Sequence, residues 1–306
     1  MLVSVIIPCY RNSATLGRAI KSVVSQTYGA IEIIVVNDNS PETTDIDRCL
    51  SEFPFVVKVV NPINLGPSAS RNIGISLARG ELIAFLDADD EYVPEKIARQ
   101  VEVIKPGMIV TCGFTRVYPD RQERVHAGVD RLISKSSSIF LRNSLNGAGL
   151  MATKDQLLNI GGYDESLGSC EDFDLYLRFL HEGTQIKVIG SSLYRYHFSP
   201  LGLSNNLENI SKWEIELIRR HASRIGNLWQ SSWKYKLMMT SIILRHLFRL
   251  EKSHNIVFRE NVKSELELLR ESPLIWWFLA VLFYSRIMKV LVILIDIKKF
   301  IFRSKF

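Results

Sequence analysis

The first hundred residues alternate short apolar runs with segments of helical periodicity. The apolar runs cover residues 3–8, 31–36, 55–60 and 82–86, and the helix-period segments cover 15–26, 68–79 and 94–103. The run at 31–36 is apolar with few interruptions, as in a strand covered on both faces. This alternation predicts an α/β fold, with a mostly parallel sheet that has helices on both faces.

Polar stretches follow three of the predicted strands. They are Cys9–Asn12, Asn37–Ser40 and Asp87–Asp90. Open α/β sheets bind ligands outside the carboxyl ends of their strands, at the point where the strand order reverses. We therefore expect these three stretches to converge in space on one binding site.

Composition indicates a folded protein of one or two domains. The chain has 306 residues, of which 47% are hydrophobic and 23% charged. Its four cysteines, Cys9, Cys49, Cys112 and Cys170, form no CxxC pair, which fits reduced thiols in a cytoplasm better than disulfides or a zinc site. The first residues have no basic segment before the predicted strand, so we expect no signal peptide.

The end of the chain is basic and apolar. Residues 274–306 hold six basic side chains and one acidic one among aliphatic residues, which favours a membrane surface over nucleic acid. The apolar run 274–284 is too short to span a bilayer alone. We favour an interfacial amphipathic element. A hairpin or tilted span, and a helix packed on another subunit, stay open.

Residues between about 205 and 270 have a helical pattern with few glycines or prolines. We therefore expect a domain at 1–204, a helical extension at 205–272 and a membrane-associating tail at 273–306.

Four carboxylates fall within five residues, at Asp87, Asp89, Asp90 and Glu91. Two aspartates one residue apart at a strand end can direct their oxygens to one Mg²⁺ or Mn²⁺ ion. An acidic, solvated turn explains the same residues equally well. The chain has no GxGxxG or GxxxxGK[ST] loop, and no HExxH or GxSxG motif, so the activities tied to those motifs are not indicated.

Five segments together resemble glycosyltransferase family 2. They are Val3–Tyr10 (VSVIIPCY), Glu32–Ser40 (EIIVVNDNS), Asn64–Gly74 (NLGPSASRNIG), Phe85–Asp90 (FLDADD) and Glu171–Arg178 (EDFDLYLR). Each motif alone is weak, but five in this order and spacing are specific, and they cover roughly residues 1–200. The resemblance implies a GT-A fold and an inverting enzyme that uses a nucleotide sugar.

The resemblance also implies a nucleotide site. Its residues would be Pro8, Tyr10 and Asn12 around the base, Asp38 hydrogen-bonded to the base (usually uracil), Arg71 near the diphosphate or the aspartates, and Asp87 at the ribose. The family usually has glycine where this chain has Asn39; asparagine tolerates the left-handed conformation, so the turn can survive.

A metal and a general base complete the implied site. Asp89 corresponds to the metal ligand, and His197 occupies a position that is often a histidine near the metal; the ion would be Mn²⁺ or Mg²⁺. Asp172 corresponds to the general base, and Glu171 would position the acceptor. Acids in the first turn of a helix are also common for purely structural reasons, and a lone histidine is as often structural.

The leading hypothesis is an inverting glycosyltransferase that moves a sugar, most simply from a UDP-linked donor, to a hydroxyl of a saccharide or lipid-linked acceptor in surface-polysaccharide assembly. It would work at the cytoplasmic face of the cell membrane. The alternatives are a metal-dependent nucleotidyltransferase and an inactive, membrane-docked scaffold with the same fold. A scaffold has no need for the set Arg71, Asp89 and Asp172.

Overall fold

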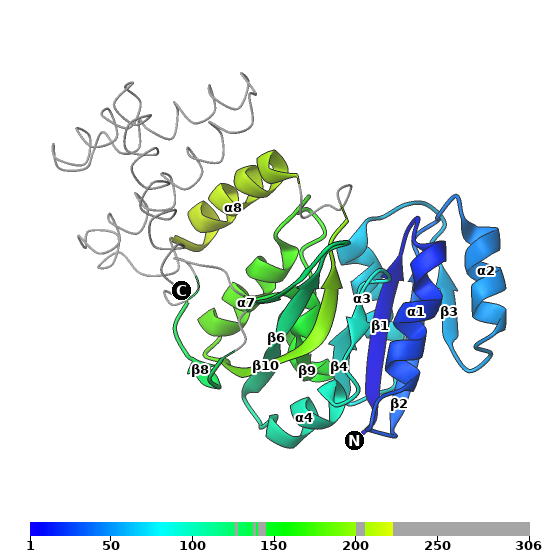
Figure 1. Ribbon diagram of the computed structural model, residues 1–306. Helices are drawn as coiled ribbons and strands as arrows, with labels where there is room; N and C mark the ends of the chain where they lie inside the picture. Colours follow the sequence, from blue (N-terminus) through cyan, green and yellow to red (C-terminus); the bar gives the residue numbers. More distant parts are fainter. Residues whose placement is uncertain (126–127, 137–138, 140–144, 200–205, 223–306) are drawn as a thin grey trace, which may run out of the picture. The chain divides into compact units, whose positions relative to one another are not determined.

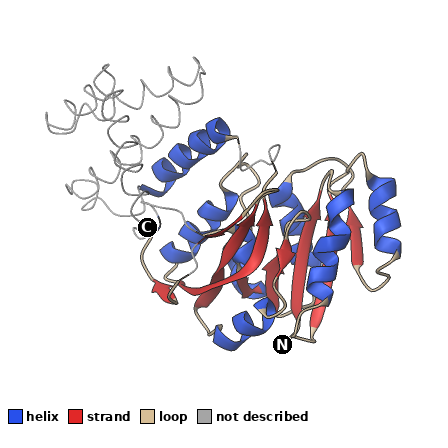
Figure 2. Ribbon diagram, in the orientation of Figure 1, coloured by secondary structure: helices blue, strands red, loops and turns tan. Residues whose placement is uncertain are grey.

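The computed structural model describes the whole chain except residues 126–127, 137–138, 140–144, 200–205 and 223–306. Within the described part the chain is α/β, with helices on both faces of one large sheet (Figures 1 and 2). The predicted fold class is therefore confirmed.

The strands are β1 (Val3–Cys9), β2 (Ile31–Asn37), β3 (Val57–Val60), β4 (Leu82–Phe85), β5 (Glu91–Tyr92), β6 (Met108–Val117), β7 (Gln122–Val125), β8 (Arg131–Ile133), β9 (Met151–Thr153) and β10 (Gln185–His197). The helices are α1 (Ser13–Val24), α2 (Thr43–Ser51), α3 (Pro67–Leu77), α4 (Lys96–Val103), α6 (Lys154–Asn159), α7 (Glu171–His181) and α8 (Leu207–Ala222), with a 3₁₀ turn η1 at Gly147–Gly149. All seven elements predicted in the first hundred residues are present, with ends within two residues of the prediction.

The strand order is β3-β2-β1-β4-β9-β6-β10-β5, with β7 on β6 and β8 on β10. Strands β3, β2, β1 and β4 are parallel neighbours, whereas β9 is antiparallel to both β4 and β6. The chain moves outward from β1 to β3 and then returns to place β4 on the other side of β1. The strand order therefore reverses beside β1, where such sheets bind ligands.

Alternation along β1 sorts its side chains between the two faces of the sheet. Val3, Val5 and Ile7 belong to one buried cluster with the apolar faces of α1 and α2. On the opposite face Ile6 meets α3 at Gly74, where an added Cβ would overlap the Ile6 side chain. Both faces of β1 are thus covered, as its continuous apolar sequence predicts.

Among the described residues, no helix is long and apolar enough to cross a bilayer. Helix α8 is the described part of the predicted extension 205–272. The predicted tail at 273–306 lies outside the described residues.

Candidate active site

The ends of β1 and β2 lie side by side and carry the residues predicted to surround the base. Cys9 and Asn37 are paired in register, and the Asp38 amide donates to the Cys9 carbonyl over 2.9 Å. Tyr10 is 39% exposed at this edge. Pro8 and Asn12 are partly buried beside it.

Two non-glycine residues adopt left-handed backbone conformations here. Arg11 has φ 55° and Asn39 has φ 52°, so the turn expected at Asn39 does form. The Arg11 amide donates to the Ser40 hydroxyl over 3.0 Å, which ties the two turns together. Left-handed non-glycine residues cluster where surrounding structure imposes them, and binding sites are common among such places.

Asp38 organises the loop that leads into α3. Its carboxylate accepts hydrogen bonds from the Asn61 side chain and from the amides of Leu65 and Gly66, each at 2.8 Å, and the residue is only 3% exposed. A carboxylate has about four lone-pair sites, so these bonds leave little capacity for a further partner. The contact of Asp38 with a base stays a prediction.

Arg71 joins two segments that lie far apart in the chain. Its guanidinium donates to Asp87 and to Glu171, each over 2.8 Å, and its side chain is 8% exposed. Burial alone would lower the pKa of Arg71, but the two carboxylates raise it well above its usual value. The ring of Tyr163 lies 5.2 Å from the guanidinium carbon. One buried cation therefore holds the end of β4 against the start of α7.

The turn after β4 keeps its acids close together. Burial and the charge of Asp87 raise the pKa of Asp89 to about 6, and burial and both neighbouring aspartates raise the pKa of Asp90 well above its usual range. The Arg18 side chain donates to the Asp89 carbonyl over 2.6 Å. The uncompensated negative charge here favours either a proton or a cation.

The donor set of this turn fits a divalent cation whose shell the substrate completes. Carboxylates supply the hard oxygen ligands that Mg²⁺ and Mn²⁺ prefer, and Mg²⁺ commonly takes one or two carboxylates plus phosphate oxygens. One carboxylate oxygen of Asp90, Oδ2, is buried without a hydrogen-bond partner. Within the described ranges, no group of three or more His, Cys, Asp and Glu side chains is arranged to hold a metal alone. The metal role of Asp89 stays a prediction.

His197 is engaged by the acidic turn. Its Nε2 lies 2.6 Å from Glu91 Oε2, and its amide donates to Asp90 Oδ1 over 2.8 Å. The structure thus brings His197 to the segment that carries Asp89. With Nε2 held by Glu91, a metal ion would be bound through Nδ1, because a metal-binding histidine commonly keeps a carboxylate on its other ring nitrogen.

Asp172 sits in the first turn of α7, beside the η1 turn. Its Oδ1 accepts from the Phe173 amide over 2.7 Å, and its Oδ2 accepts from the Gly147 amide over 3.1 Å. Burial, and then the charge of Glu171, raise its pKa to about 7, although the two amides and Arg71 act in the opposite direction. A carboxylate with a pKa near neutrality is suited to general-base catalysis.

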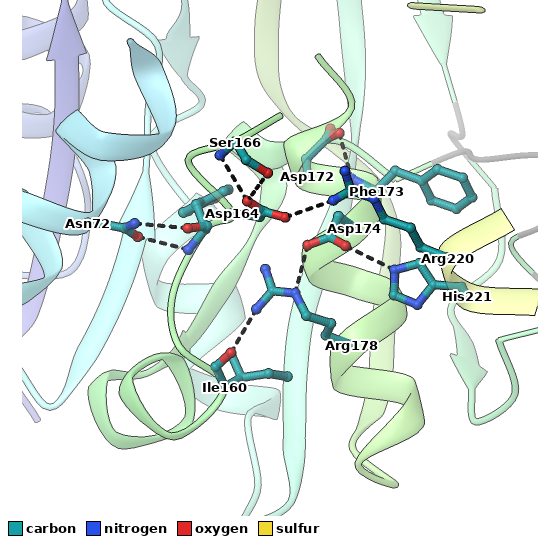
Figure 3. Close-up of polar contacts among 11 residues, drawn as sticks. Asn72, Ile160, Asp164, Ser166, Asp172, Phe173, Asp174, Arg178, Arg220 and His221 are labelled. Carbon is teal, nitrogen blue, oxygen red and sulfur yellow. Dashed lines mark hydrogen bonds and ion pairs between the residues drawn. The ribbon is translucent and has the colours of Figure 1, made fainter. Parts of the chain in front are cut away.

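The other face of α7 packs on α8 through ionic contacts (Figure 3). Asp174 is 4% exposed and accepts from Arg178 over 2.6 Å, and it lies 2.9 Å from His221 Nε2. Burial alone would raise the pKa of Asp174, but His221 and Arg178 lower it. A polar cavity of about 580 Å³, lined in part by Asp164 and Arg220, adjoins these contacts. Asp174 is thus a structural neighbour of the candidate base.

Three residues that contact the predicted site residues were not themselves predicted to belong to the site. Arg18 lies on α1, Asn61 follows β3, and Glu91 adjoins the aspartates, yet they contact Asp89, Asp38 and His197 respectively. Glu91 was visible only as one more acid. The partners of Arg18 and Asn61 depend on packing across 71 and 23 residues of chain, which no local pattern records.

Known proteins resemble this chain in sequence. The family model described as glycosyl transferase family 2 matches residues 4–157. An uncharacterized glycosyltransferase of Haemophilus influenzae is 30% identical over 231 residues, which is 72% of this chain and 76% of the relative. The uncharacterized glycosyltransferase EpsJ of Bacillus subtilis is 27% identical and is matched over 63% of its length, with 66% of this chain covered.

Solved structures share the fold. The structure of S. aureus TarS residues 1–349 in complex with UDP-GlcNAc has a TM-score of 0.58 at 18% identity, covering 80% of this chain and 83% of that one. The complex of the same protein with UDP has a TM-score of 0.55 at 20% identity, covering 80% of each chain. The family model matches half of this chain, and a 30% identical relative is matched over three quarters of that relative's length. This chain therefore belongs to glycosyl transferase family 2 and is a glycosyltransferase.

Proposed function

We propose that this protein is an inverting glycosyltransferase that takes a sugar from a nucleoside-diphosphate donor, most simply a UDP-sugar. The acceptor hydroxyl oxygen attacks the anomeric carbon on the face opposite the diphosphate. Asp172 takes the proton from that hydroxyl while the bond from the anomeric carbon to the diphosphate oxygen breaks.

The bridge from Asp87 through Arg71 to Glu171 is the observation that carries this proposal. The Arg71 guanidinium donates over 2.8 Å to Asp87, the predicted ribose-binding residue, and over 2.8 Å to Glu171, which directly precedes the predicted base. A nucleotide sugar bound at the end of β4 and a general base at the start of α7 can therefore take part in one reaction. Glu171, which contacts Arg71, would orient the acceptor.

The choice of UDP is supported by the relatives in structure and by the sequence at the strand ends. TarS has been solved with UDP and with UDP-GlcNAc. In this chain Pro8, Tyr10, Asn12 and Asp38 lie together at the ends of β1 and β2, next to the point where the strand order reverses. An exposed tyrosine ring there offers a face on which a base can stack.

Asp89 would hold Mn²⁺ or Mg²⁺, with Nδ1 of His197 as a second ligand while Glu91 keeps Nε2. Bound there, the ion would neutralise the charge that develops on the departing diphosphate. The chain contributes the Asp89 carboxylate, and the Arg18 side chain holds the backbone of Asp89 by donating to its carbonyl over 2.6 Å.

The acceptor is proposed to be a saccharide or a lipid-linked saccharide in surface-polysaccharide synthesis at the inner face of the cell membrane. The support is the sequence of the tail at 273–306, which combines aliphatic residues with an excess of basic ones. Four unpaired cysteines agree with a reducing compartment.

Calorimetric titration with UDP, GDP and TDP, each with and without Mn²⁺, tests the donor. We expect UDP binding that depends on Mn²⁺ and that Asp89→Ala removes. Binding of another nucleotide would replace UDP in the proposal. Absence of binding by folded protein would favour the scaffold, and nucleotidyl transfer without need of Asp172 would favour the nucleotidyltransferase.

A further inference from the structure

Helix α4 places a lysine and a glutamine in the interior of the protein. Lys96 and Gln100 are both 0% exposed, and Lys96 Nζ donates to Gln100 Oε1 over 2.7 Å. The same Nζ lies 3.9 Å from the centre of the Tyr92 ring. No carboxylate among the described residues forms an ion pair with Lys96, and burial lowers its pKa to about 8.

The lysine determines which way the glutamine amide faces. An ammonium group only donates hydrogen bonds, so the amide oxygen of Gln100 must face Lys96 and its NH₂ group must face away. That NH₂ group donates to the carbonyl of Gly149 over 2.7 Å. A reversed amide would set its oxygen against the Gly149 carbonyl oxygen.

The η1 turn connects this pair to Asp172. Gly149 ends the turn, and Gly147 begins it and donates its amide to Asp172 Oδ2 over 3.1 Å. A Cβ at position 147 would lie 3.4 Å from the Asp172 Cβ, so the turn packs directly on the carboxylate. On the α7 side the Tyr176 hydroxyl donates to the Asn146 carbonyl over 3.0 Å.

We infer that Lys96 and Gln100 are positioning residues for Asp172: they hold the η1 turn so that the Gly147 amide reaches the carboxylate. The catalytic consequence of this arrangement rests on the proposed function of Asp172. Neither residue touches the reacting atoms.

Packing alone does not explain a buried ammonium without a carboxylate partner. Taking a cation out of water is unfavourable, and an apolar side chain of the same length would fill the space without that penalty. The largest effects of charged groups on the pKa of Asp172 come from Glu171 and Arg71, so Lys96 has no dominant electrostatic effect on it. Lys96 therefore acts through the chain of hydrogen bonds.

The titration of Asp172 in the full-length protein tests this inference without donor or acceptor. The probe is the ¹³C shift of aspartate side-chain carboxyls, with the Asp172 signal assigned by its loss in Asp172→Asn. The titratable neighbours Cys170, Tyr163 and Tyr176 have raised pKa values, so they stay protonated across the range.

Lys96→Met and Gln100→Met each remove one link at nearly constant volume. We expect the Asp172 titration midpoint to move upward by about one pH unit in each, because the carboxylate loses support from an amide donor. The double variant should shift no further than Gln100→Met alone, because both residues act on one path. The double variant leaves neither a lone ammonium nor a lone amide oxygen at this place, although the Gly149 carbonyl loses its donor as it does in Gln100→Met.

Gln26→Met is the matched control. Gln26 accepts from the Ile97 amide over 3.0 Å and donates to the Val93 carbonyl, so it anchors the same helix without contacting η1. It should leave the Asp172 midpoint unchanged. Unchanged midpoints in Gln100→Met and in the double variant would overturn the inference. Shifted midpoints together with full activity of Asp172→Asn would instead retain the positioning role and reject the proposed function.

Discussion

The two acidic segments of the site carry similar side chains in different surroundings. In residues 171–174 every carboxylate has a donor of its own: Glu171 has Arg71, Asp172 has two backbone amides, and Asp174 has Arg178 and His221. In residues 87–91 donors are fewer. One oxygen of Asp90 has no partner, and burial with mutual repulsion raises the pKa of Asp89 and Asp90.

The difference agrees with the different tasks proposed for the two segments. Charge that the protein leaves uncompensated favours an incoming cation, whereas carboxylates with fixed donors keep a set orientation. Asp172 combines fixed donors with a pKa of about 7, so it can exchange a proton near neutral pH. Arg71 is the side chain that the two segments share.

The largest expected effect comes from Asp172→Asn. An amide cannot accept the acceptor proton, so turnover should fall about 10³-fold, while UDP affinity stays within about threefold. Steady-state kinetics and calorimetry on the same preparation measure both. Turnover within tenfold of the wild type would assign the base elsewhere.

Arg71→Lys tests the connection that Arg71 makes between the two acidic segments. A lysine is a single point charge and cannot donate to Asp87 and Glu171 in the fixed fork of a guanidinium. We expect kcat/KM to fall about 10²-fold. Arg79→Lys is the control, because Arg79 follows the same helix, is 76% exposed at its side chain and pairs with Glu32. Equal kinetics in the two variants would show that the shared bridge has no role.

Asp174→Asn should leave the chemistry intact and weaken the fold. The variant loses the charge that Arg178 and His221 contact, at an expected cost of about 2 kcal/mol in the free energy of unfolding. Because the folded pKa of Asp174 is lowered, its contribution to stability is present at neutral pH and is lost as pH falls through that value. Urea unfolding at pH 7 and pH 3 measures the loss, which should shrink at pH 3.

How much of this structure the sequence predicts depends on how far apart in the chain the interacting residues lie. Local periodicity predicted seven of the strands and helices of the first hundred residues, because burial on a face repeats every two or about 3.6 residues, but α2 and β5 were not predicted. The convergence of residues at 9–12, 37–40 and 87–90 followed from parallel strands, whose carboxyl ends share an edge. The resemblance to a family placed Glu171 and Arg71 in one site, but it did not predict the ion pair between them.

Other contacts lie beyond sequence patterns. The interior position of Lys96 contradicts the usual exposure of lysine, and its partner Gln100 reaches Gly149 across 49 residues of chain. Likewise, Asp38 was predicted at the base, and the structure shows its carboxylate accepting three hydrogen bonds from the loop that leads into α3. Such pairings are decided by packing between elements that are distant in the chain.

The smallest expected effect is a shift in the pH dependence of kcat/KM, which reports the protonation of Asp172. A general base works when deprotonated, so kcat/KM should rise with pH and level off above about 7. Glu171 raises the pKa of Asp172 by its charge, so Glu171→Gln should move the midpoint downward by about one pH unit. Glu165→Gln, which removes a charge paired with Asn72 at the protein surface, is the control and should leave the midpoint in place. An upward shift in Glu171→Gln would mean that Glu171 acts mainly by holding Arg71 near Asp172, since a displaced guanidinium would no longer lower the pKa of the base.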